Sequence, residues 1–224
     1  MHTQRRKRSP TGWHGVCSIP GMLKNLAHLA LRIWLKLFHR YRVLGRLSLE
    51  SPSLIIANHA SHIDIAVITA AALEYADYSV RGAAARDTIF TQPGVVLCVL
   101  RFLFNVFPFE RKNGSSESLE RCTDYIQRGY HVIIFPEGRR SQDGSFLGFT
   151  PGFAKIAYAT GAPVIPLRIE GAHRALPRGS FVLLPCPMEL KVRPSLAADR
   201  TIPWDDRRQA YERLIHQANR SLAS

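Results

Sequence analysis

Short apolar runs alternate with segments of helical periodicity along the chain from residue 53 onward. A short apolar run bounded by polar or glycine positions is typical of a buried strand, whereas apolar positions three and four apart are typical of a helix. The strands predicted in this way are residues 53–57, 78–83, 106–109, 131–135, 164–169 and 188–192. The predicted helices are residues 61–73, 95–104, 116–127, 152–159 and 201–218.

This alternation predicts the fold class. Strands that alternate with helices favour an α/β domain, here a single domain with a mixed, mostly parallel central sheet flanked by helices. No internal repeat or low-complexity linker divides this part of the chain. Residues 46–224 are therefore expected to form one domain.

An amphipathic helix is predicted ahead of this domain, over residues 22–45. Basic side chains recur at every fourth position and would form one stripe: Lys24, His28, Arg32, Lys36 and Arg40. The remaining surface is wide and apolar, with many leucines and with Trp34. Such a helix is typical of a bilayer interface, where anionic lipid attracts the basic stripe. The alternative is a helix that packs its apolar face on the domain and turns its basic stripe to water.

The charge of the chain supports the membrane interpretation. Thirty Lys and Arg against 17 Asp and Glu give a net charge of +13, and residues 1–50 hold ten of the basic residues with a single acid, Glu50. A nucleic-acid-binding domain would carry its basic residues on its folded face. We therefore expect an anionic membrane surface, and no nucleic acid, as partner, with residues 1–21 as a flexible basic leader.

Neither a secretory signal nor a membrane-spanning helix is predicted. The leader lacks an apolar core, and no uncharged apolar run reaches about 18 residues. The four cysteines show no paired spacing typical of a metal site or a disulfide framework. The expected location is peripheral or monotopic, on the cytoplasmic face of the inner (plasma) membrane.

The first polar cluster, Asn58-His59-Ala60-Ser61-His62-Ile63-Asp64, directly follows a predicted strand. Ser61 and Asp64 form the pattern of a capping box, so the helix is expected to begin at Ser61. His59 then lies in the loop before the cap, where the carboxylate of Asp64 can reach its imidazole. In one continuous helix the two side chains would lie about 140° apart and could not pair.

Such a pair suits base catalysis on a hydroxyl. An alcohol becomes a good nucleophile when a base takes its proton, and histidine titrates in the useful pH range. A carboxylate on the other ring nitrogen fixes the tautomer and stabilises the imidazolium. In the alternative interpretation Asp64 only caps the helix, and His62 is the active histidine or a surface residue; the spacing favours His59.

Three further clusters also adjoin predicted strands. Arg111 follows the strand at 106–109, where its planar guanidinium can grip a phosphate, although a surface ion pair is the alternative. In Phe135-Pro136-Glu137-Gly138-Arg139-Arg140-Ser141, a glycine allows close approach of a ligand, and two adjacent arginines, oriented by the glutamate, make an anion site. Pro166, inside an apolar strand, indicates an edge strand or the wall of a ligand groove.

In this order the four clusters resemble the four motif blocks of the glycerolipid acyltransferase family, whose best-known members are the 1-acylglycerol-3-phosphate (lysophosphatidate) acyltransferases. The resemblance covers residues 54–171. It implies that His59 is the catalytic base and Asp64 its partner, and that Arg111 contacts the acceptor phosphate. Glu137, Gly138 and Arg139 match the family's acceptor-binding loop. Pro166 matches the last block, which is tied to the acyl donor or to groove structure.

The resemblance also implies a function. Family members use acyl-CoA or acyl-acyl carrier protein, need no metal or other cofactor, and dock on membrane through an N-terminal helical element, which residues 22–45 match. The expected reaction moves a fatty acyl group to the free hydroxyl of a lysophospholipid, first of all 1-acylglycerol-3-phosphate, giving phosphatidate. The alternatives are another acceptor, such as lyso-ornithine lipid or lysophosphatidylglycerol, and a non-catalytic lipid-binding module.

Two positions depart from the family pattern. Asn105 stands where the second block often opens with glycine, and Arg139 stands where many members have threonine. The additional arginine would enlarge the anion site or shift the preferred head group.

Overall fold

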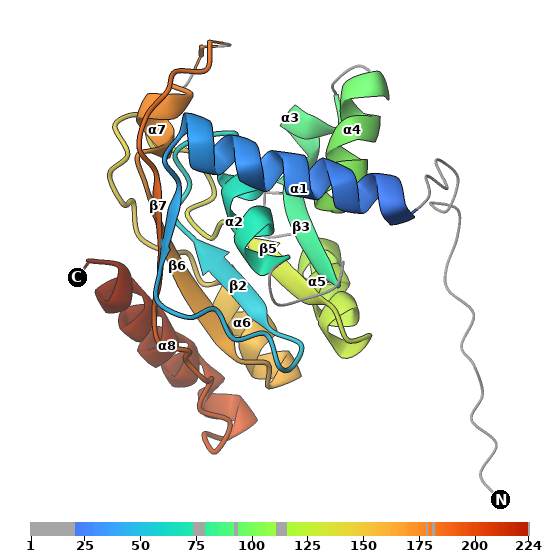
Figure 1. The fold of residues 1–224 in the computed structure, drawn as a ribbon. Coiled ribbons are helices and arrows are strands. Elements are labelled where there is room, and N and C mark those ends of the chain that lie inside the picture. Colours follow the sequence, from blue (N-terminus) through green and yellow to red (C-terminus); the bar gives the residue numbers. More distant parts are fainter. Residues whose placement is uncertain are drawn as a thin grey trace, which may run out of the picture.

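A seven-stranded mixed sheet lies at the centre of the computed structural model, which describes residues 21–73, 79–91, 94–110, 116–177, 179–180 and 182–223 (Figure 1). The strand order is β1-β7-β6-β2-β5-β3-β4. The strands are β1 Arg42–Leu44, β2 Leu54–Ala57, β3 Val80–Ala85, β4 Val106–Phe109, β5 His131–Ile134, β6 Val164–Glu170 and β7 Glu189–Val192. β2 to β6 run parallel, whereas β7 pairs antiparallel with β6 and β1 runs with β7. The predicted fold class is confirmed.

Helices cover both faces of this sheet (Figure 1). They are α1 Gly21–Phe38, α2 Asp64–Ala72, α3 Arg86–Ile89, α4 Gly94–Phe104, α5 Ser116–Gln127, α6 Gly152–Thr160, α7 Ala172–Ala175 and α8 Arg207–Ala223, with a 3₁₀ turn η2 at Trp204–Asp206. α1, α2 and α4 lie over one face, and α5, α6 and α8 lie over the other. The domain therefore has three layers.

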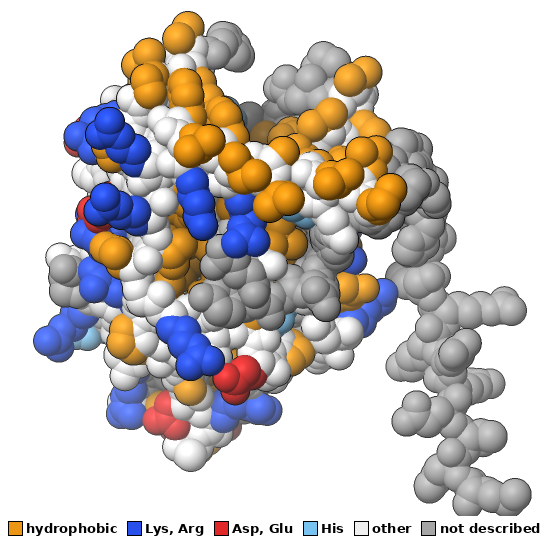
Figure 2. Space-filling view, in the orientation of Figure 1, with side chains coloured by type: hydrophobic (Ala, Val, Ile, Leu, Met, Phe, Trp, Pro, Cys, Tyr) orange, Lys and Arg blue, Asp and Glu red, His pale blue; other side chains and the backbone are white. Residues whose placement is uncertain are grey.

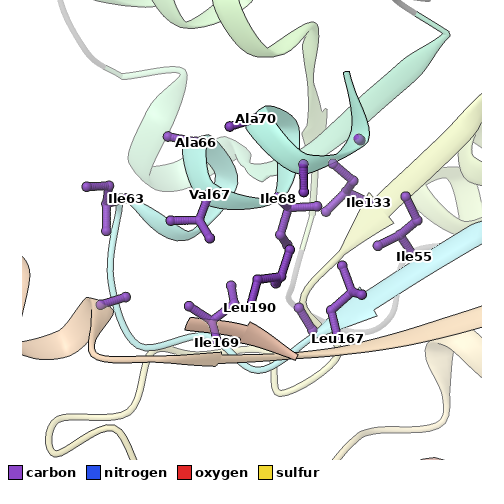
Figure 3. Close-up of a cluster of buried hydrophobic side chains, with 14 of the residues drawn as sticks. Ile55, Ile63, Ala66, Val67, Ile68, Ala70, Ile133, Leu167, Ile169 and Leu190 are labelled. Carbon is purple, nitrogen blue, oxygen red and sulfur yellow. The ribbon is translucent and has the colours of Figure 1, made fainter. Parts of the chain in front are cut away.

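The alternation of side chains along the strands builds two apolar layers. Ile55 of β2 and Ile133 of β5 face α2, whereas Leu54 and Ile56 face the layer of α5, α6 and α8. Figure 3 shows the first of these layers, in which α2 packs its apolar residues onto β2, β5, β6 and β7. A strand buried on both faces is a near-continuous apolar run, as the sequence of β2 predicts.

Most predicted elements are present, with changes at their ends. The strand at 106–109 and the helix at 116–127 have the predicted bounds, and the last helix continues to Ala223. Three short elements were not predicted, namely β1, α3 and α7. Each has only three or four residues, too few for a periodic pattern.

The N-terminal helix is shorter than predicted. α1 ends at Phe38, and Arg40 adopts a positive φ of 46°, a conformation that ends a helix. The chain then enters β1, which pairs with β7, so the expectation of a helix to residue 45 is wrong. The leader predicted for residues 1–21 lies outside the described residues, except for Gly21.

Much of the apolar surface of α1 points away from the domain. Met22 is 73% exposed and Leu37 is 78% exposed, and Leu23, Leu26, Leu29 and Ile33 are also exposed. By contrast, His28 is buried and Lys24 is half-buried against the domain. Leu35, however, is fully buried in the core, and Leu31 and Trp34 pack beside it. The alternative in which the apolar face packs on the domain therefore holds for this part of the helix and not for its exposed row. None of the described helices is long and apolar enough to cross a membrane.

Polar contacts attach α1 to the domain. Lys24 Nζ donates a hydrogen bond of 2.8 Å to Asn105 Oδ1, and His28 Nε2 lies 2.7 Å from the carbonyl oxygen of Leu103. Asn105 itself has a positive φ of 47°. That conformation explains why glycine suits this position, and asparagine is among the few other residues that tolerate it.

Candidate active site

The loop between β2 and α2 brings His59 and Asp64 together. The His59 Nδ1 to Asp64 Oδ2 distance is 2.8 Å. His59 lies in the loop, and the carboxylate projects back from the first residue of α2. The pairing predicted from the capping pattern is confirmed, because the chain reverses before the helix begins.

Asp64 is fully buried and also fixes the loop backbone. Its Oδ2 accepts hydrogen bonds from the backbone N–H groups of Ala60 and Ser61, at 2.8 and 2.9 Å. The predicted capping box is thus formed in part, and α2 starts three residues later than expected, at Asp64. The Ser61 hydroxyl instead donates to the carbonyl oxygen of Leu176, at 2.9 Å, and so ties the loop to the end of α7.

The loop after β5 packs directly against the imidazole. The ring of Phe135 stacks on that of His59, with centroids 4.3 Å apart and planes inclined by 20°. The backbone N–H of Ser141 donates to the His59 carbonyl oxygen at 2.8 Å. Both loops follow the carboxyl ends of neighbouring parallel strands, which is where α/β folds place reactive groups. The His59 side chain is 14% exposed, so the pair is held rigidly but remains accessible.

Glu137 supports this arrangement from within. Its carboxylate accepts hydrogen bonds from the backbone N–H groups of His59, at 3.1 Å, and Leu147, at 3.3 Å. Its position in the sequence predicts that it orients the neighbouring arginines, but in the structure its oxygens bind these two amides instead. Burial raises the pKa of Glu137 to about 7, and the charge of Asp64 adds to that shift, while the two amide hydrogen bonds oppose it.

The turn at the tip of this loop presents a glycine and an arginine to solvent. Gly138 has a positive φ of 71°, so the turn favours glycine at this position. Arg139 is exposed, and its guanidinium is therefore accessible to an anion. Arg111, the other predicted phosphate ligand, lies outside the described residues.

Two predicted motif positions have structural surroundings that the sequence did not reveal. The side-chain amide of Asn58 forms two hydrogen bonds with the backbone of β6. Its Nδ2 donates to the Ile169 carbonyl oxygen and its Oδ1 accepts from the Ile169 N–H, at 2.9 and 2.7 Å.

Pro166 is buried in β6, an internal strand, so the expectation of an edge strand is wrong. Internal proline is tolerated because the β6–β7 ladder begins only at Leu167.

Sequence reasoning missed Phe135 as a contact of the imidazole and Leu176 as the partner of Ser61. A strand-end phenylalanine gives no chemical signal, and the Ser61–Leu176 contact joins residues 115 positions apart.

Chemically, the site holds a histidine whose Nδ1 is hydrogen-bonded to a buried carboxylate. Its Nε2 is then the nitrogen that can accept a proton from a substrate.

Two plant acyltransferases resemble the chain in sequence. A chloroplastic 1-acyl-sn-glycerol-3-phosphate acyltransferase of Brassica napus is 30% identical over 166 residues, which are 70% of this chain and 46% of that protein. A chloroplastic counterpart from Arabidopsis thaliana is 28% identical over 166 residues, covering 70% of this chain and 44% of that protein. The chain thus spans about half the length of these relatives.

The fold is also that of a solved structure. The crystal structure of the 1-acyl-sn-glycerophosphate acyltransferase of Thermotoga maritima is similar, with a TM-score of 0.63 and 22% identity. The similarity covers 93% of this chain and 85% of that one. Because residues 39–170, more than half of the chain, match the family model described as Acyltransferase, this chain belongs to the acyltransferase family.

Proposed function

We propose that this protein is an O-acyltransferase that moves a fatty acyl group from acyl-CoA or acyl-acyl carrier protein to the free hydroxyl of a lysophospholipid. The preferred acceptor is 1-acylglycerol-3-phosphate, and the product is phosphatidate. The observation that carries this proposal is the His59–Asp64 pair at the carboxyl edge of a parallel sheet. The relatives that bear the names of acyltransferases for this acceptor support the same substrate.

The reaction needs a single base. The acceptor hydroxyl attacks the thioester carbonyl carbon while Nε2 of His59 accepts its proton, and Asp64 stabilises the imidazolium. The tetrahedral intermediate then collapses, the carbon–sulfur bond breaks, and the thiolate takes the proton back from His59. No acyl-enzyme is required, because the acceptor oxygen is itself the nucleophile.

The acceptor phosphate is bound by arginines on the loops beside the catalytic pair. Arg139 is exposed on the turn that directly follows the phenylalanine stacked on His59. We assign it, with Arg111 and the backbone at Gly138, to the phosphate, because a guanidinium can bind two phosphate oxygens at once. Glu137 contributes by holding the loop, and Pro166 by its place within the sheet.

The substrates are membrane lipids, and α1 provides a surface on which the protein can meet them. The apolar row from Met22 to Leu37 is exposed along the length of α1 (Figure 2). A helix of this kind lies in the bilayer interface with its apolar side chains among the acyl chains. The protein would thus bind the membrane peripherally, through this face.

A panel of acceptors tests the substrate assignment. Purified protein is incubated with palmitoyl-CoA or palmitoyl-acyl carrier protein and with lysophosphatidate, lysophosphatidylglycerol or lyso-ornithine lipid, and products are identified by mass spectrometry. We expect phosphatidate as the main product. Arg139→Ala should raise the apparent KM chiefly for lysophosphatidate, whose phosphomonoester carries the most charge. An equal effect on all acceptors would contradict a phosphate role for Arg139.

A further inference from the structure

Two exposed apolar tips flank the outer face of α1. Val182 and Leu184, in the loop between α7 and β7, are 65% and 48% exposed. Val95 and Val99, one turn apart in α4, are 77% and 48% exposed. In Figure 1 the α7–β7 loop rises above one end of α1 and α4 rises above its other half, and Figure 2 shows apolar atoms on both tips and along the helix. Three segments far apart in sequence therefore expose apolar side chains on one side of the molecule.

The α7–β7 loop is hydrogen-bonded both to the residue that directly follows α1 and to the catalytic loop. Beyond its apolar tip, His39 Nδ1 lies 3.3 Å from the carbonyl oxygen of Cys186, and the Met188 N–H donates to the carbonyl oxygen of His39. Before the tip, the carbonyl oxygen of Leu176 accepts from the Ser61 hydroxyl, two residues from His59. The loop that carries the apolar tip is therefore in direct hydrogen-bond contact with the loop that carries the catalytic pair.

We propose that α1, the α7–β7 loop through Val182 and Leu184, and the first turns of α4 through Val95 and Val99 form one membrane-docking plane. The proposal rests on the membrane role assigned to α1 above and extends it. A single helix in the interface is a line about which the protein can still roll. Contacts to one side of that line, at two separate points, remove this freedom and fix the angle at which the site faces the bilayer.

Charge complementarity identifies the occupant as an anionic bilayer. Exposed basic residues lie on α1 and just after it, at Lys36, Arg40, Arg42 and Arg46. In Figure 2, Lys and Arg side chains lie beside the apolar row of α1. Apolar side chains bordered by basic ones match an interface in which acyl chains lie beneath anionic head groups. A protein partner of ordinary composition would offer no such excess of negative charge.

A fluorescent probe that senses polarity tests this plane position by position. In the full chain with Cys17→Ser, Cys98→Ser and Cys186→Ser, single cysteines replace Leu37, Val95, Val182 or Arg208, and each is labelled with an NBD dye. Cys122 is fully buried and stays unlabelled. Arg208 is the control, since its side chain is 91% exposed on α8, on the opposite side of the molecule (Figure 1).

With vesicles of phosphatidylglycerol and phosphatidylcholine, emission should shift to the blue and rise at 37, 95 and 182, and stay unchanged at 208. A response at 37 without one at 95 or 182 would show that α1 docks alone and overturn the proposal. A blue shift at 182 that needs no vesicles and grows with protein concentration would identify a second copy as the occupant, and also overturn it. No response anywhere would remove the docking role of α1 as well.

Paired variants separate docking from chemistry. Val182→Ser with Leu184→Ser should weaken vesicle binding about tenfold or more, because two apolar side chains no longer enter the bilayer. Val182→Ile with Leu184→Ile keeps the apolar area and should bind like the wild type. Both pairs should retain wild-type acyl transfer in detergent micelles, so that failure of the proposed reaction itself would be seen separately, in the wild type. Unchanged vesicle binding in the serine pair would contradict the plane.

Discussion

α1 and α8 are both amphipathic helices on the outside of the same domain, yet they face opposite ways. α8 turns its apolar stripe inward, with Ala210, Leu214, Ala218 and Leu222 all buried. Its outer face is polar, as the Arg208–Glu212 ion pair shows. α1 exposes most of its apolar stripe and packs only Leu31, Trp34 and Leu35 on the core. Polar contacts of Lys24 and His28, and of His39 directly after the helix, complete its attachment.

The difference shows that the same kind of sequence pattern serves two purposes. Burying an apolar stripe in the core stabilises the fold, by about 25 cal/mol per Å² of apolar surface. Leaving it exposed sacrifices that free energy, which is regained only when another apolar phase covers the stripe. In α1 a short apolar contact at Leu35 and the polar contacts hold the helix in place, while the apolar side chains of its outer face remain accessible to lipid.

The largest expected contrast is in stability. Leu214→Ala in α8 should lower the free energy of unfolding by about 2–5 kcal/mol, because it leaves a cavity in the core. Leu37→Ala in α1 should change it by less than about 0.5 kcal/mol, since the side chain is exposed. Urea unfolding measures both. Equal losses would show that α1 is packed as α8 is.

The reverse contrast is expected in membrane binding. Met22→Ser with Leu37→Ser should weaken binding to anionic vesicles about tenfold to hundredfold, since burial of each side chain contributes up to about 1.5–3 kcal/mol. The matched control is Arg208→Ser with Glu212→Ser on α8, which should bind normally. Vesicle sedimentation measures both pairs. Wild-type binding by the α1 pair would move the anchor elsewhere.

The two helices should also respond differently to acid. Burial lowers the pKa of His28 and His39, and Lys24 lowers that of His28 further. The unfolded chain then binds more protons than the folded one below about pH 6.5, so the attachment of α1 weakens as the pH falls. Hydrogen exchange, corrected for intrinsic rates, should show α1 loosening between about pH 7.5 and 5.5 and α8 unchanged. Equal protection of α1 at both values would contradict this.

The smallest effect is expected at the residue that departs from the family pattern. Asn105→Gly removes the acceptor of Lys24 but relieves a positive φ, so global stability should change by less than about 1 kcal/mol. The local effect should be faster hydrogen exchange in the first turns of α1. Exchange like that of the wild type would show that the Lys24–Asn105 contact does not hold the helix.

Much of the fold could be predicted because it rests on local patterns. The strand at 106–109 and the helix at 116–127 have the bounds that periodicity and a closing glycine indicate. β1 could not be predicted, since its three residues pair only with a strand more than a hundred positions away. The direction of the apolar face of α1 was equally hidden, because amphipathicity defines a stripe without saying which side meets the domain.

The site divides in the same way. The contact between His59 and Asp64 follows from a local capping pattern and is confirmed. The partners of Glu137 were mistaken, because its sequence neighbours are arginines whereas its carboxylate turns inward to amides of the β2–α2 loop and of a later part of its own loop. Contacts of this kind depend on which strands lie side by side, and a single sequence does not reveal that.

Acceptor-dependent thiol release tests the central claim most directly. Palmitoyl-CoA is supplied in detergent micelles with and without lysophosphatidate, to the wild type, His59→Ala and, as the matched control, the exposed neighbour His62→Ala. We expect release that requires the acceptor, falls about 10²–10⁴-fold in His59→Ala, and persists in His62→Ala. An undiminished rate in folded His59→Ala would contradict the assignment of the base and, with it, the proposed mechanism.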